Sequence, residues 1–229
     1  EPYLAALLPA VLELASHKAK PVALAAENAV KSFASNMSPH AVKVVLPMLF
    51  AAIDIAKKWQ TRALALRVIG SFADHAPEQL GAALPLVVPE LTPCMSDTKK
   101  QVKEAAIAAM TAACDVIGNR DMEHMTADIV RAIMNPAEVP EIMHVLAGVT
   151  FVQSVESPAL AMVVPLLLRG CAVNATATRR QAAVIIDNMS KLVDDPIDAK
   201  PFLPLLMPAL EKAANTISDP EARGVADRA

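Results

Sequence analysis

Apolar residues recur along the chain at the spacing of one face of an α-helix. The stretch Arg179–Pro196 illustrates the pattern, with a stripe at i, i+3, i+4, i+7 and i+11 formed by Ala182, Ile185, Ile186, Met189 and Val193. Asp187 and Lys191 fall on the opposite side, where their spacing suits an i,i+4 ion pair. The stretch therefore predicts an amphipathic helix, opened by basic residues and closed at Asp-Asp-Pro.

Proline residues mark a repeat of this plan. They recur beside the same apolar neighbours at intervals of 38, 38, 80 and 39 residues, at Pro9, Pro47, Pro85, Pro165 and Pro204. An interior proline costs a helix about 3 kcal/mol, so its return at one phase indicates equivalent helices with a shared kink. A period near 40 with two helices per unit is typical of HEAT solenoids.

The predicted fold is all-α, a HEAT-repeat superhelix (α-solenoid) of about five and a half two-helix repeats. In chain order, the expected helix pairs are Tyr3–Ser16 with Val22–Met37, Pro39–Ala56 with Trp59–His75, Glu78–Met95 with Lys99–Ile117, Asp121–Met134 with Val139–Val155, Pro158–Ala172 with Thr178–Val193, and Lys200–Ile217 with a truncated helix from Pro220. The fourth pair lacks the phased proline and is expected to be irregular.

The repeats are expected to form a single domain, residues 1–229, because no long linker, low-complexity tract or block of charge interrupts them. The chain starts without Met, inside a helical pattern, and stops in mid-pattern. We therefore expect a fragment of a larger protein.

Composition supports a helical core and argues against a membrane span. Hydrophobic residues make up 54% of the 229 residues but aromatics only 3%, which suits closely packed helices. Mean hydropathy is +0.38, yet the uncharged apolar runs stay near eleven residues, short of the roughly 18–20 that a bilayer needs. Three widely spaced cysteines in apolar surroundings indicate buried thiols in a reducing compartment. A cytoplasmic location without membrane association is the expectation.

Motifs for chemistry are missing from the sequence. None of the six glycines opens a phosphate-binding GxxxxGK[ST] loop. The five histidines fall on different predicted helices without a His-x-x-x-His pair, and no motif would activate a cysteine or serine nucleophile. We therefore expect no catalytic residue, metal site, cofactor site or small-molecule substrate in this chain.

Basic residues instead gather where the second helix of each pair begins, except in the fourth pair, which offers Glu138 and Glu141. Stacked repeats would align these positions along one edge as a basic ridge on a body of net charge −3. Its candidate RNA-binding residues are Lys57, Lys58, Arg62, Lys99, Lys100, Lys103, Arg179, Arg180 and Lys191. Two interpretations stay open: a solvated face that supports the helices, or an electrostatic track for RNA phosphates or an acidic protein surface. Acidic and basic residues such as Asp97 can also form a structural ladder between neighbouring turns.

Six motifs in order resemble one family. They are Lys58-Trp59-Gln60, Asp97-Thr-Lys-Lys-x-Val-Lys103, Glu138-Val-Pro-Glu141, Val184-Ile-Ile-Asp-Asn-Met189, Lys191-Leu-Val193 and Asp219-Pro-Glu-Ala-Arg223. Together they resemble the HEAT region of the fungal-type translation elongation factor 3 family, an ATP-binding-cassette family, over essentially the whole chain.

The resemblance implies a non-catalytic arm that binds ribosomal RNA and ribosomal proteins, with other translation factors as further partners. It also implies ATP and Mg in cassette domains outside this chain, and ATP-dependent release of deacylated tRNA from the exit site. Two alternatives remain. The fifth repeat is also similar to the ribosome-associated activator of the starvation-response kinase, and a generic protein-binding HEAT scaffold would share the same fold.

Overall fold

The structure is a computed structural model that describes residues 3–229, and its described part is helical without strands. Contacts divide the chain into two compact units, Glu1–Val116 and Ile117–Ala229. The all-α prediction is confirmed. The expectation of one continuous domain stays a prediction.

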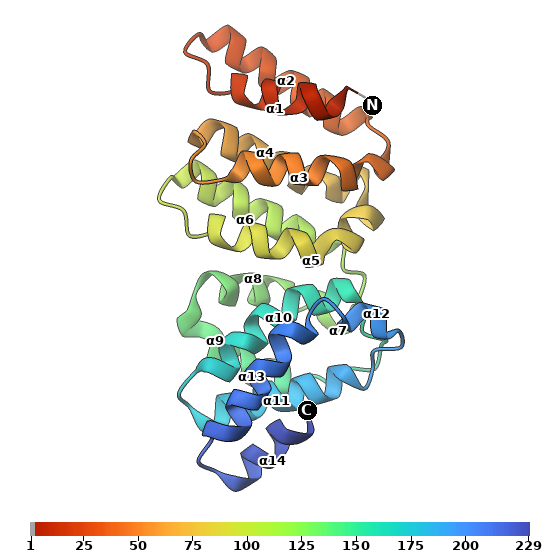
Figure 1. Cartoon of the computed structure of the whole chain (residues 1–229), viewed down its shortest axis with the longest axis vertical. Helices are drawn as coiled ribbons and strands as arrows, with labels where there is room; N and C mark the ends of the chain where they lie inside the picture. The colour runs from red at the N-terminus through yellow and green to blue at the C-terminus, as the bar shows by residue number, and fades with distance from the viewer. Residues whose placement is uncertain (1–2) are drawn as a thin grey trace. The chain divides into compact units, whose positions relative to one another are not determined.

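The first unit holds three helix pairs. Their bounds are α1 (Leu4–Leu14) with α2 (Lys20–Asn36), α3 (Val42–Ile53) with α4 (Trp59–His75), and α5 (Pro77–Cys94) with α6 (Lys100–Asp115). Figure 1 shows α1, α3 and α5 in one layer and α2, α4 and α6 in the other, and helices contact their neighbours within each layer. A short 3-10 turn, Pro39–Ala41, precedes α3. This is the stacked two-helix plan that the proline period predicts.

The core of the first unit lies between its two layers, and α4 is its most buried helix. Leu64, Leu66 and Phe72 on α4 are fully buried. Gly70 allows α4 and α6 to approach closely, because a Cβ at this position would lie 3.1 Å from the Cα of Ala109. Burial on every side of α4 fixes the register of the turns at its ends.

The second unit contains four helices of the regular pattern after an irregular start. Its elements are α7 (Arg120–Glu123), α8 (Thr126–Met134), the 3-10 turn Pro136–Glu138, α9 (Val139–Ala147), α10 (Ser157–Ala172), α11 (Thr176–Ser190), α12 (Pro196–Ala199), α13 (Leu203–Thr216) and α14 (Pro220–Arg228). Contacts of α8 with α10 and of α10 with α13 form one layer, and contacts of α9 with α11 and of α11 with α14 form the other. The pairs α10/α11 and α13/α14 match the fifth and sixth predicted repeats.

The fourth repeat departs from the expected helix pair. The first expected helix is two helices, α7 and α8, and α9 ends at Ala147 although the pattern predicts a helix to Val155. After α9 the backbone is held by side chains: the Asp121 carboxylate accepts the backbone N–H groups of Val152 and Gln153 at 2.7 and 2.8 Å. These contacts satisfy the backbone without a helix, which is why the apolar pattern misleads here.

The sixth repeat also begins differently from the expectation. The short α12 forms where the sequence predicts a turn, and Asp195 caps it by accepting the backbone N–H of Ile197 at 2.9 Å. Pro204 consequently lies in the first turn of α13, while Pro9, Pro47, Pro85 and Pro165 lie inside their helices as predicted.

Candidate functional site

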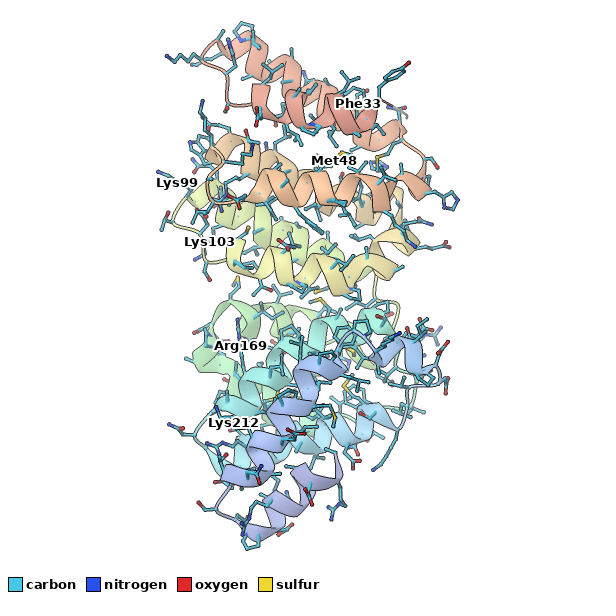
Figure 2. The ribbon with its side chains drawn as sticks, in the orientation of Figure 1. Phe33, Met48, Lys99, Lys103, Arg169 and Lys212 are labelled. Carbon is cyan, nitrogen blue, oxygen red and sulfur yellow. The ribbon has the colours of Figure 1, made fainter. Side chains whose placement is uncertain are left out.

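The turns that join the helices of the second and third repeats enclose a surface hollow in the first unit. It measures about 480 Å³ and is lined by Ile55, Lys57, Lys58, Trp59, Gln60, Arg62, Asp97, Thr98 and Lys99. Three of the predicted ridge lysines therefore lie around one hollow. Figure 2 shows Lys99 and Lys103 at the same lateral edge of this unit.

The floor of the hollow is a buried ion pair. A guanidinium nitrogen of Arg62 lies 2.6 Å from Asp97 Oδ2, and the two side chains are only 7% and 8% exposed. Arg62 Nε also donates to the Ile53 carbonyl at 2.9 Å, at the end of α3. The prediction that Arg62 belongs to an exposed basic ridge is therefore wrong: its guanidinium is buried and joins adjacent repeats through Asp97. The pair confirms the expected ladder at this position.

Hydrogen bonds keep the Asp97 carboxylate ionised. Burial alone would raise the pKa of this carboxyl, but the backbone N–H of Lys99, 2.7 Å from Oδ1, and the Arg62 guanidinium together lower the pKa below its usual value. Asp97 therefore fixes the turn that carries Lys99. Through that contact the buried pair positions one wall of the hollow.

The lysines of the first unit differ in their neighbours. Lys57 Nζ lies 2.6 Å from Glu13, and this ammonium lowers the pKa of the Glu13 carboxyl by donating a hydrogen bond to it. Lys100 pairs more loosely with Glu104 at 3.7 Å. Within the described residues, Lys58, Lys99 and Lys103 are exposed and make no ion pair.

Two helix N-termini add positive potential to the same place. Lys58 is the N-cap of α4 and Lys99 the N-cap of α6, and neither helix has a side-chain cap or an acidic residue in its described first turn. The unpaired N–H groups of a helix N-terminus carry a partial positive charge, so a lysine there is unfavourable by about 0.3–1 kcal/mol. Some other helices have a preferred capping residue, such as Asn119 on α7 and Asp219 on α14, while others, such as α2 and α11, begin at an alanine.

In the second unit the predicted ridge residues are paired. Arg179 donates to the Val173 carbonyl at 2.6 Å and to Thr216 Oγ1 at 3.2 Å, so it serves the packing of α11. Arg180 pairs with Glu221 at 2.8 Å. Lys191 pairs with Asp187 at 2.6 Å, as the i,i+4 spacing predicts. None of these three resembles the unpaired lysines of the first unit.

Sequence reasoning missed part of the hollow. Ile55, which is 84% exposed, and Thr98 line it from the same turns as the lysines. The sequence offered one signal: an isoleucine, Ile55, stands just before Lys57 and Lys58 in a short turn between helices, where polar residues are usual.

The cysteines are poor candidates for chemistry. Burial raises the pKa of the Cys114 thiol to about 12 and that of Cys171 to about 11, and desolvation also raises the pKa of Cys94. Such thiols stay protonated near neutral pH. Among residues 3–229, no group of His, Cys, Asp and Glu side chains could hold a metal ion.

No single helix of the described chain combines the length and apolar character of a membrane span. Among the described residues, only Lys20–Asn36 and Pro39–Ile53 reach that length and apolar character when they are taken together, and the chain bends by 116° between them.

Two known protein families match this chain, one in each of its two units. The family described as EF3 N-terminal HEAT repeat matches residues 1–110, and the family described as Elongation factor 3/GNC1 HEAT repeat matches residues 138–229. Among solved structures, an engineered protein aligns over 96% of this chain and 94% of its own with 16% identity and a TM-score of 0.37. A designed armadillo repeat protein covers 96% and 97% with a TM-score of 0.34.

Curated relatives agree over the whole length. Elongation factor 3 of Phytophthora infestans is 47% identical over 229 residues, which is 100% of this chain and 22% of that protein. Elongation factor 3 of Gonapodya prolifera is 44% identical over 100% of this chain, and elongation factor 3B of Saccharomyces cerevisiae is 44% identical over 98%. The chain spans about a fifth of the length of these relatives. It consists of HEAT repeats, and it belongs to the elongation factor 3 HEAT-repeat family.

Proposed function

We propose that this chain is a non-catalytic ribosome-docking arm of an elongation factor 3-like protein, and that the hollow in its first unit binds RNA phosphate. The observation that carries the proposal is the pair of exposed lysines at the N-caps of two helices, Lys58 on α4 and Lys99 on α6, which make no ion pair within the described residues. Their placement costs folding energy that a bound polyanion would offset. Family membership supplies the partner, since the relatives are named as translation elongation factors.

The rest of the factor's activity belongs to parts outside this chain. We propose that ATP and Mg bind there and that ATP hydrolysis drives release of deacylated tRNA from the exit site. In this arrangement the arm supplies affinity and orientation, and the other contacts raise its effective concentration at the ribosome. Such a role places the protein in the cytoplasm, where ribosomal RNA, ribosomal proteins and other translation factors are its partners.

The alternative of a starvation-kinase activator shares ribosome association, but the curated relatives quoted above are elongation factors, which favours the first assignment. A generic protein-binding scaffold predicts indifference to ribosomes.

Ribosome cosedimentation over a range of salt concentrations tests the proposal. The test variant is Lys58→Glu with Lys99→Glu, and the control is Lys43→Glu with Lys200→Glu, which gives the same net charge from two exposed lysines outside the hollow. Reversal places carboxylates at helix N-termini, which favours the helices, but it also places negative charge near Glu13 and Asp97. Circular dichroism therefore has to show that both variants are folded before lost binding is assigned to the hollow.

We expect the test variant to lose binding at low salt and the control to retain it. The slope of log affinity against log salt should fall by about 0.7–0.9 per lost phosphate contact. Equal binding by both variants, or no binding by the parent chain at low salt, would contradict the proposal.

A further inference from the structure

The hollow that the proposed function assigns to phosphate is not purely electrostatic. Besides Lys57, Lys58 and Lys99 it is lined by Trp59, the single tryptophan of the chain, and by Ile55. Phosphate binding alone needs no apolar wall. An aromatic ring beside cations is instead the arrangement that proteins use to hold the bases of single-stranded nucleic acid.

The exposure of Trp59 sets it apart from the core. It is 37% exposed in the first turn of α4, whereas Phe72 on the same helix is fully buried. Part of Trp59 is therefore covered by the protein, and the residue is among those that line the hollow. An immobilised ring loses little entropy when a base stacks on it.

The polar groups of the hollow complete a nucleotide site. Gln60 contributes an amide and Thr98 a hydroxyl, which can donate to and accept from a base edge. The floor contributes no free charge, because Arg62 and Asp97 neutralise one another at 2.6 Å. Lys58 and Lys99 approach from different turns and make no ion pair in the described chain, so both ammonium groups are available to a flanking phosphate.

We infer that the hollow between the turns of the second and third repeats binds an unpaired nucleotide of RNA, with the base against Trp59 and its phosphates against Lys58 and Lys99. The inference rests on the proposed function and narrows its ligand. In an A-form duplex the bases are stacked on one another and present only their edges to a protein, so a duplex offers no free base face to stack on Trp59. An acidic peptide would engage the lysines but offers no base to stack.

Intrinsic fluorescence provides a direct measurement, since every photon from an indole in this chain comes from Trp59. Titration of the 229-residue chain with a single-stranded RNA oligonucleotide at low salt should quench this emission to saturation. An RNA duplex of the same length, and polyglutamate, should bind weakly or bind without quenching.

Two substitutions separate stacking from packing. Trp59→Leu keeps an apolar side chain and should weaken single-strand binding roughly 5- to 100-fold, the range for loss of one base–aromatic stack, whereas Trp59→Phe should retain most of the affinity. Because these variants lack tryptophan, their affinity is measured with a labelled oligonucleotide, and circular dichroism confirms that both are folded.

The outcomes distinguish this inference from the proposed function. Charge-dependent RNA or ribosome binding without quenching, or with Trp59→Leu binding as well as the parent, would overturn the nucleotide site and leave the docking role standing. Equal quenching by duplex or polyglutamate would also overturn it. Failure of the parent chain to bind both ribosomes and RNA would remove the two proposals together.

Discussion

Loss of Arg62 should destabilise the first unit more than any other single change of a charged residue in its hollow. Arg62→Met keeps much of the side-chain volume but leaves Asp97, with its side chain 8% exposed, without its cationic partner and leaves the Ile53 carbonyl without its side-chain donor. Removing one member of a buried pair costs about 3–5 kcal/mol, a large part of the roughly 5–15 kcal/mol that stabilises a typical domain.

The same helix offers a matched control. Arg67 on α4 pairs with Glu27 at 3.1 Å, but its side chain is 45% exposed, so Arg67→Met should cost only about 0.2–1 kcal/mol. Urea unfolding followed by Trp59 emission measures both, since Trp59 lies three residues before Arg62 in the same helix. Repeat proteins can unfold in steps, so the transition should also be followed by circular dichroism.

The double variant Arg62→Met with Asp97→Asn completes the cycle. It removes both charges and should recover part of the loss, because no unpaired charge remains buried. The argument would be refuted if Arg62→Met cost less than about 1 kcal/mol, or if the double variant were as unstable as the sum of the two single variants.

The pH dependence of the pair has a fixed sign. Because the pKa of Asp97 is lowered in the folded chain, its stabilising contribution is present above the unfolded-state value and is lost as pH falls through the lowered folded value. The free energy of unfolding of the parent chain, measured in urea at a series of pH values, should therefore fall in acid. The double variant Arg62→Met with Asp97→Asn should lose less over the same pH range.

Four further substitutions test helix packing, the irregular repeat and an exposed ion pair. Gly70→Ala should destabilise by about 1 kcal/mol, since overpacking against the α6 backbone exceeds the gain in helix propensity, while Gly224→Ala, with open space around its Cβ, should stabilise by about 0.5–1 kcal/mol in thermal unfolding. Asp121→Asn should speed hydrogen exchange at the backbone amides of Val152 and Gln153, which donate hydrogen bonds to the Asp121 carboxylate. These hydrogen bonds lower the pKa of Asp121. In the parent chain, the protection of the two amides should therefore fall as pH drops through that lowered pKa. Lys191→Ala should cost only about 0.3–0.5 kcal/mol, as expected for an exposed pair with Asp187.

Local sequence signals were sufficient wherever the repeat is regular. The periodic stripes place α4, α6 and α11 within a few residues, and the i,i+4 spacing identifies the Asp187–Lys191 pair. The end of α9 could not be read in this way, because the Asp121 contacts that hold the following backbone join residues 31 and 32 positions apart. Long-range hydrogen bonds of this kind override local propensity.

The candidate site was predictable in part for the same reason. The sequence identifies basic residues near the start of most second helices, but it does not separate a residue at the N-cap from one a turn further on. Lys58 and Arg62 lie on the same helix end, yet one is exposed and the other 6% exposed. Which side of α4 is buried depends on how the helix packs between its neighbours, and this packing is known only from the structure.

This packing divides the basic residues into two rows with different roles. Arg62 and Arg179 both occupy the fourth position of their helices, and both donate Nε to the carbonyl near the end of the preceding helix, Ile53 in one unit and Val173 in the other. The same contact of these two arginines occurs in both units, which assigns them to the repeat fold, whereas Lys103 at the fourth position of α6 is exposed.

The second row, at the N-cap, is different in the two units. The first unit has Ala19 on α2, Lys58 on α4 and Lys99 on α6 at this position, whereas the second has Ala175 on α11 and Asp219 on α14. A fold requirement would be met alike in every repeat, and capping energy alone favours Asp. The lysines therefore oppose the stability preference of their own helices in one unit only. The negatively charged ligand that we propose for the first unit would account for this difference, whereas the arginine row shared by both units would not.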